Sequence, residues 1–142
     1  MQTFDERGIM MKTFEELRGR TIEAIYIDEH EHQLLFETED GPFIYTASGD
    51  CCNTVWFAHI TLPPRLDGSF VMSIESKDWR KSTVYMRGDD AEEEAFWTLL
   101  TSNGYIDIEV RNSHNGYYGG DVALNSTGKF NMDTARKITE DF

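Results

Sequence analysis

Two Asn-Gly pairs, Asn103-Gly104 and Asn115-Gly116, divide residues 96–124 into three runs rich in β-branched and aromatic residues. Asn-Gly tolerates a positive φ at both central positions of a type I′ turn, and the twist of that turn suits two flanking antiparallel strands. The spacing therefore predicts a C-terminal three-stranded antiparallel meander.

The first of these turns also predicts a register. If Asn103-Gly104 is a two-residue turn, counting outward from it pairs the flanking strands. One face then holds three apolar pairs: Thr101 with Ile106, Leu99 with Ile108, and Trp97 with Val110. The other face mixes apolar and charged side chains: Phe96, Thr98 and Leu100 across from Arg111, Glu109 and Asp107.

The second turn gives a different result, because the same count places Val122 on the side of Glu109. A bulge at Gly119-Gly120 would restore the apolar face. It would form three pairs: Val122 with Val110, Leu124 with Ile108, and Asp121 with Arg111.

Upstream of the meander, strand-like runs alternate with turns. Residues 21–28, 32–39 and 42–48 read as three strands, the last two linked through Asp40-Gly41. A strand is favoured over a helix for residues 53–60, and the alternation over 70–76 predicts another strand. Residues 77–94 read as a polar connection with one short strand at 83–86.

Two short helices complete the predicted fold. Thr13 and Glu16 match a capping box, with Gly19 as the stop, and residues 133–139 form the second helix. The sequence thus predicts an α+β fold, mostly antiparallel sheet of about seven strands. We expect a flexible leader over residues 1–12, a single domain over 13–125 and a polar tail over 126–142.

The charge of the chain limits the classes of molecule that it can bind. Its 142 residues include 13 basic and 26 acidic side chains, for a net charge of -13. Such a field repels phosphate backbones, so we expect no direct contact with nucleic acid. No apolar run approaches the roughly 20 residues that span a bilayer, and the first residues lack the basic and apolar regions typical of a signal peptide, so we expect no membrane contact and a location in the bacterial host cytoplasm.

The two cysteines, Cys51 and Cys52, are adjacent and could join only through a strained vicinal disulfide, so reduced thiols are expected. Neighbouring strand residues point to opposite faces, which disfavours one zinc ion held by both thiols with His59 and His114. Acidic surroundings also oppose a thiolate nucleophile. We therefore expect no catalytic residue, no metal and no cofactor.

Carboxylates offer another kind of site. Asp107, Glu109 and Asp121 would lie on one face of the predicted meander and could hold a hard cation beside Arg111. A solvated strand face is the favoured interpretation, because no phosphate-binding glycine loop accompanies them.

Four short elements occur in a distinctive order. They are Asp50-Cys51-Cys52 followed by Val55 and Trp56, Gly68-Ser69 before a strand that ends at Glu75, Asn103-Gly104-Tyr105, and Asn115-Gly116-Tyr117-Tyr118. Over residues 13–124 this order resembles a family of uncharacterised proteins from phages and bacteria. In that family a DCC-x-x-V element precedes a "GS" strand, and a K-G-Y strand runs into S-N-G-Y-Y. The resemblance implies a phage or prophage origin and supplies no catalytic residues.

This sequence departs from the family at two positions: Asn103 stands where Lys is usual, and His114 replaces a small residue. The leading hypothesis for function is a phage or prophage accessory protein that binds another protein and uses its acidity to antagonise a host or defence factor. Two alternatives stay open, a small metal-dependent or cysteine-based enzyme and a binder of a nucleotide-like ligand. An exposed edge strand also leaves a homodimer open. The candidate binding residues are Asp50, Cys51, Cys52, Trp56, His114, Asn115, Tyr117, Tyr118 and Asp121.

Overall fold

The computed structural model describes residues 12–49, 53–87, 90–114, 120–125 and 127–142, with the backbone alone for residues 80–87, 90, 91 and 114. Its elements in chain order are η1 (Glu15–Leu17), β1 (Thr21–Ile27), β2 (Gln33–Thr38), β3 (Gly41–Ser48), β4 (Asn53–Thr61), β5 (Ser69–Arg87), β6 (Asp90–Thr101), β7 (Gly104–His114), β8 (Asp121–Leu124) and β9 (Arg136–Lys137). In this part of the chain, no helix is long and apolar enough to cross a membrane.

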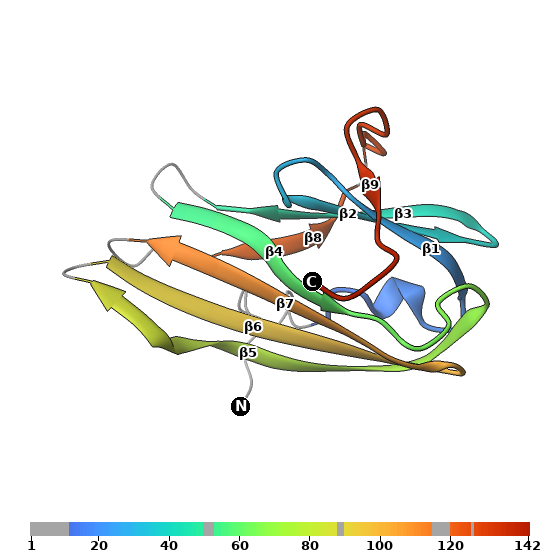
Figure 1. Cartoon of the computed structure of the whole chain (residues 1–142), viewed down its shortest axis with the longest axis horizontal. Helices are drawn as coiled ribbons and strands as arrows, with labels where there is room; N and C mark the ends of the chain where they lie inside the picture. The colour runs from blue at the N-terminus through green and yellow to red at the C-terminus, as the bar shows by residue number, and fades with distance from the viewer. Residues whose placement is uncertain (1–11, 50–52, 88–89, 115–119, 126) are drawn as a thin grey trace.

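Eight strands form one hydrogen-bonded path in the order β4-β7-β6-β5-β1-β2-β3-β8, and β9 pairs with β1. All of the strand pairs are antiparallel. Within the described residues, the first four strands pair with the other four at a single junction, where Thr21 and Ile22 of β1 meet Phe70 and Ser69 of β5. Figure 1 shows the two groups as two layers, so the path folds over on itself at this short junction.

The core lies between the two layers and is rich in aromatic rings. Phe14 packs against Phe36, Tyr45 and Trp97, with ring centroids 5.9, 4.4 and 5.4 Å away. All four side chains are fully buried. Phe14, which comes just before η1, therefore packs against rings from β2, β3 and β6, and these contacts hold the two layers together.

The prediction of an α+β fold is wrong, since 61% of the chain is strand and 3% is helix. The expected capping box does not form, because the Thr13 hydroxyl donates to the carbonyl of Val122 (2.7 Å) and Phe14 has a left-handed φ of 76°. Only a three-residue 3₁₀ turn remains. The expected helix over 133–139 is also absent, because Arg136 and Lys137 pair with β1 and Ile138 is buried.

The predicted C-terminal meander is also wrong in its third strand. β8 pairs with β3, with Val122 opposite Ala47 and Asp121 opposite Ser48, so Asp121 does not lie beside Arg111. Val122 is fully buried in the common core. Because β8 lies in the opposite layer, it reaches that core without adding a strand to β7.

The predicted β6–β7 hairpin exists, but its turn is Ser102-Asn103 and Thr101 pairs with Gly104. The Thr101 hydroxyl fixes this turn by donating to the carbonyl of Gly104 (2.6 Å) and accepting from the amide of Asn103 (3.1 Å). At the end of this turn, Gly104 has a positive φ of 128°. The same arrangement recurs at Thr38 and Gly41, so Thr-x-x-Gly is this fold's turn signal.

Residues 77–94, predicted as a polar connection, instead belong largely to a long β5–β6 hairpin. The β5–β6 register shifts between Lys77 and Arg80 and again between Lys81 and Met86. Each shift interrupts the period-2 pattern, because a bulge moves the following side chains to the other face. That interruption hides the strand from a reading of the sequence.

Tyr45 gives the fold a predictable response to alkali. Its hydroxyl donates to Glu16 Oε1 (2.9 Å), and burial, followed by the nearby Glu16 charge, raises the pKa of Tyr45 above its ordinary value. The folded chain therefore holds this proton more tightly than the unfolded chain. The resulting stabilisation is complete below about pH 10, the ordinary tyrosine pKa, and is lost as the pH rises above it.

We expect Tyr45→Phe to cost about 1 kcal/mol at pH 7, because one hydrogen bond is lost. Above about pH 10, the free energy of unfolding of the wild-type chain should fall by about 1.4 kcal/mol per pH unit because of Tyr45. The variant lacks this hydroxyl and should not show that fall. Urea unfolding at several pH values measures both effects. Tyr105→Phe, at an exposed tyrosine, is the control, and an identical alkaline slope for wild type and Tyr45→Phe would contradict the prediction.

Candidate functional site

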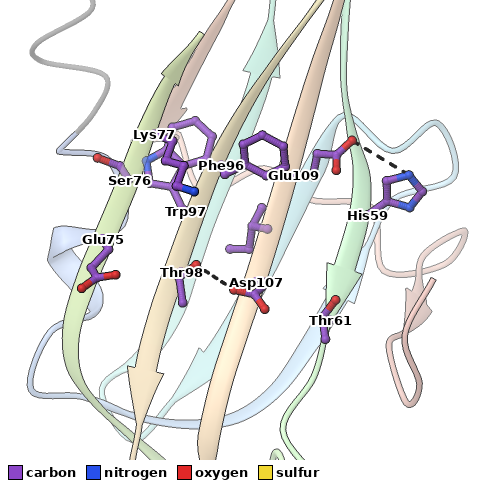
Figure 2. A pocket seen from close by; sticks show the side chains of 11 residues that line it. His59, Thr61, Glu75, Ser76, Lys77, Phe96, Trp97, Thr98, Asp107 and Glu109 are labelled. Carbon is purple, nitrogen blue, oxygen red and sulfur yellow. Dashed lines mark hydrogen bonds and ion pairs between the residues drawn. The ribbon is translucent and has the colours of Figure 1, made fainter. Parts of the chain in front are cut away.

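The outer face of β4, β7, β6 and β5 holds a hollow of about 720 Å³. Side chains alternate along these strands, so that Ile106 and Ile108 enter the core while Asp107 and Glu109 face outward. Figure 2 shows the side chains around the hollow. The residues that line this groove are His59, Thr61, Glu75, Ser76, Lys77, Phe96, Trp97, Thr98, Asp107, Ile108 and Glu109.

The strand register sorts most of these residues into two rows across the sheet. The first row runs from β5 to β4 through Glu75, Thr98, Asp107 and Thr61. The second row runs through Lys77, Phe96, Glu109 and His59. Each strand thus contributes one residue to each row, and neighbouring rows lie about 7 Å apart along the strands.

The groove is acidic. Three carboxylates line it, and Lys77 is its single fixed positive charge, so the net charge of the lining is −3 + 1 = −2 with His59 neutral. Asp107 accepts a hydrogen bond from the Thr98 hydroxyl (2.7 Å), which fixes one carboxylate on the floor. His59 Nε2 lies 3.9 Å from Glu109 Oε2, as the dashed line in Figure 2 shows.

Arg111 lies next to the groove on β7 and holds three carboxylates. Its guanidinium nitrogens lie 2.7 Å from Glu109 Oε2, 3.1 Å from Glu92 Oε1 and 3.5 Å from Glu94 Oε2. The hydrogen bond to Glu109 is the largest cause of the raised pKa of Arg111. This cluster of Arg111, Glu92, Glu94 and Glu109 fixes the position of the Glu109 side chain at the end of the groove.

Apolar side chains border the opposite end of the groove. Leu100 of β6 pairs with Tyr105 of β7, and Tyr105 is 57% exposed. Phe70 and Met72 of β5 are also exposed, at 42% and 46%. The outer face therefore passes from an apolar end, through the groove, to the Arg111 cluster.

The structure places only some of the residues predicted to form a site. Trp56 lies on β4 opposite Arg111, half-buried, and Asp121 is exposed on β8 in the other layer. His114 ends β7 opposite Asn53, and its side chain is not described. The remaining candidates, Asp50, Cys51, Cys52, Asn115, Tyr117 and Tyr118, lie outside the described residues.

The described flanks of those candidates do converge. Asn53 follows the Asp50-Cys51-Cys52 segment and pairs with His114, which precedes Asn115. On the other side, Ser48 pairs with Asp121. The described residues that flank these two segments therefore lie at paired strand ends, Asn53 with His114 and Ser48 with Asp121.

A reading of the sequence identified the mixed face of β6 and β7 but missed the groove. Glu75, Lys77 and His59 come from β5 and β4, whose position beside that hairpin depends on long-range pairing. A local signal does exist in β4, where exposed His59 and Thr61 flank buried Ile60. Within the described ranges, no group of three or more His, Cys, Asp or Glu side chains could hold a metal ion.

Fold and groove together define an antiparallel β protein with an open acidic hollow on one sheet face. The chain belongs to the family described as Domain of unknown function (DUF7448), whose match covers residues 15–124. The predicted membership of an uncharacterised domain family is thereby confirmed. No curated protein and no solved structure matches the chain.

Proposed function

We propose that this protein acts by binding, and that the groove receives a basic side chain of a partner protein. The observation that carries the proposal is the hollow itself, which is lined by the three carboxylates of Glu75, Asp107 and Glu109. Carboxylates attract an arginine or lysine side chain through charge-assisted hydrogen bonds. The volume of the groove lies within the roughly 300–1,000 Å³ of typical ligand sites.

The arrangement of the groove favours a basic side chain over the other ligands considered. A nucleotide would bring phosphates toward three carboxylates, and its charge would be repelled. Arg111 already holds Glu109, whereas Glu75 is exposed at the rim of the groove. The groove is also lined by exposed side chains such as Glu75 and Asp107, so a side chain presented by a protein surface can reach it.

This function fits the hypothesis of an acidic antagonist. A protein with a net charge of -13 is drawn over long distances to a basic partner, and the groove would then fix one of that partner's side chains. Our proposal includes the phage or prophage origin and a host or defence protein as the target. The metal-dependent or cysteine-based enzyme stays an alternative centred on the Asp50-Cys51-Cys52 segment, which lies outside the described residues.

The test measures binding of an amidated arginine-rich hexapeptide by calorimetry, with a glutamate-rich hexapeptide as the negative probe. Asp107→Asn removes one charge while keeping an oxygen for the Thr98 hydroxyl, and we expect it to weaken binding about tenfold, or about 1.4 kcal/mol. Glu75→Gln should weaken binding in the same direction. Added salt should weaken wild-type binding, because the attraction is screened.

Glu23→Gln is the matched control, since Glu23 is an exposed carboxylate on β1 in the other layer. This variant has the same net charge as Asp107→Asn but an intact groove. Equal weakening by both variants would show that the peptide responds to overall charge alone, and the proposed site would be abandoned.

A further inference from the structure

β5 forms an open sheet edge beside the groove. Its first residues pair with β1, and Val71 exchanges backbone hydrogen bonds with Gly19 (2.8 Å) and Arg20 (2.9 Å). From Ser73 to Lys77 it pairs regularly with β6 on one side. On its other side, this run has no backbone partner in the described part of the chain. An edge of this kind is a template for another strand.

The edges at the two ends of the strand path are more occupied. On β4, the amide of Phe57 donates to the carbonyl of Glu31 (2.8 Å), and Ile60 and Phe142 exchange two backbone hydrogen bonds (3.2 and 3.1 Å). On β8, the carbonyl of Val122 accepts from the Thr13 hydroxyl (2.7 Å). The run from Ser73 to Lys77 is therefore an open edge of five residues next to the groove.

Symmetry restricts how β5 could pair with a second copy of itself. Hydrogen-bonded and non-hydrogen-bonded pairs alternate along an antiparallel ladder, so a two-fold axis must pass through a residue that faces its own copy. An axis through Glu75 would oppose two carboxylates, and an axis through Lys77 would oppose two ammonium groups. An axis through Ser76 instead places Glu75 opposite Lys77 of the partner subunit, and Lys77 opposite Glu75 of the partner subunit.

We propose that two copies of this chain pair antiparallel through β5, with the two-fold axis at Ser76. Charged residues on an edge strand normally oppose self-pairing, but in this register they form two opposite-charge pairs. Glu75 and Lys77 are both exposed on the outer face. The dimer then carries one continuous sheet of eight strands, β4-β7-β6-β5 in each copy, with both grooves on the same face.

The pairing also completes the wall of the groove. Glu75, Ser76 and Lys77 form the β5 side of the hollow, and Figure 2 shows them along one strand. In the dimer, Lys77 of the partner subunit would lie beside Glu75 at this wall. The two grooves would be related by the same axis, so the dimer suits a partner that presents two basic side chains.

A charge exchange tests the pairing by sedimentation. Pairing through a single strand is expected to give a weak dimer, so protein concentration is raised to about 1 mM to populate it. We expect wild type to dimerise and Glu75→Lys and Lys77→Glu each to be monomeric over the same range, because each places like charges opposite one another. The double variant E75K/K77E should dimerise again.

A mixture of the two single variants provides the sharpest result. One chain then carries two lysines and the other two glutamates, so both cross-strand pairs are attractive and a heterodimer should form although neither variant pairs with itself. Lys129→Glu, at an exposed site outside the sheet, controls for net charge and should leave the dimer unchanged. A monomeric wild type at about 1 mM, dimeric single variants, or a mixture that stays monomeric would each overturn the proposal.

Discussion

Arg111→Met is expected to lower the free energy of unfolding by about 2–4 kcal/mol at pH 7, because it removes the guanidinium that Glu92, Glu94 and Glu109 share. The Arg111 side chain is 19% exposed, and Glu92, Glu94 and Glu109 are 17%, 12% and 16% exposed. Water screens such groups poorly. Urea unfolding at pH 7 measures the loss.

The pKa of Arg111 is raised above its ordinary value, and the hydrogen bond to Glu109 is the largest cause. The guanidinium therefore keeps its charge throughout the pH range in which the protein can be studied.

Arg18→Met is the matched control, because Arg18 pairs with Glu15 at 2.7 Å but is 50% exposed. An exposed ion pair contributes about 0–1 kcal/mol. If both variants lost the same amount, the Arg111 cluster would be no more than a surface ion pair. Arg111→Lys should fall between the two, since an ammonium cannot reach three carboxylates with the geometry of a guanidinium.

The faces of β6 and β7 could be predicted from the sequence even though their register could not. The predicted register is wrong by two residues, as Leu99 pairs with Ile106 and not with Ile108. Strand side chains repeat every two residues, so an error of two leaves every side chain on its predicted face. Apolar alternation therefore determined the core face of this hairpin, while the Thr101 hydroxyl determined the turn.

The partner of β8 could not be predicted in this way. A strand of four residues carries one buried side chain, Val122, and either layer could bury it. The outcome depends on the packing of β3 and η1, which are distant in sequence. Local patterns predicted the helices wrongly for the same reason, because the Thr13 hydroxyl bonds to β8 instead of capping a helix.

The groove shows the same limit. The mixed face of Phe96, Thr98, Asp107 and Glu109 follows from alternation in one hairpin. Its side walls need β5 and β4, which pair with β6 and β7 through contacts between residues far apart in the chain. Two rows of four residues across four strands cannot be recognised from local patterns, although each residue occupies an outward position.

Trp97 is the largest of the fully buried side chains and connects the two layers through its contact with Phe14. Its position also carries a cost. The indole N–H is buried and has no hydrogen-bond partner among the described residues, and an unsatisfied buried donor costs about 1–3 kcal/mol. Removing the ring and removing only the N–H should therefore have very different effects.

We expect Trp97→Ala to destabilise the fold by about 3–5 kcal/mol, because it leaves a cavity between the two layers. Trp97→Phe should cost much less, about 1–2 kcal/mol, since the smaller ring keeps part of the packing and removes the unpaired donor. Urea unfolding of both variants measures the two losses. Equal losses would mean that the N–H has a partner such as a bound water, whose hydrogen bond the phenylalanine variant would also forfeit.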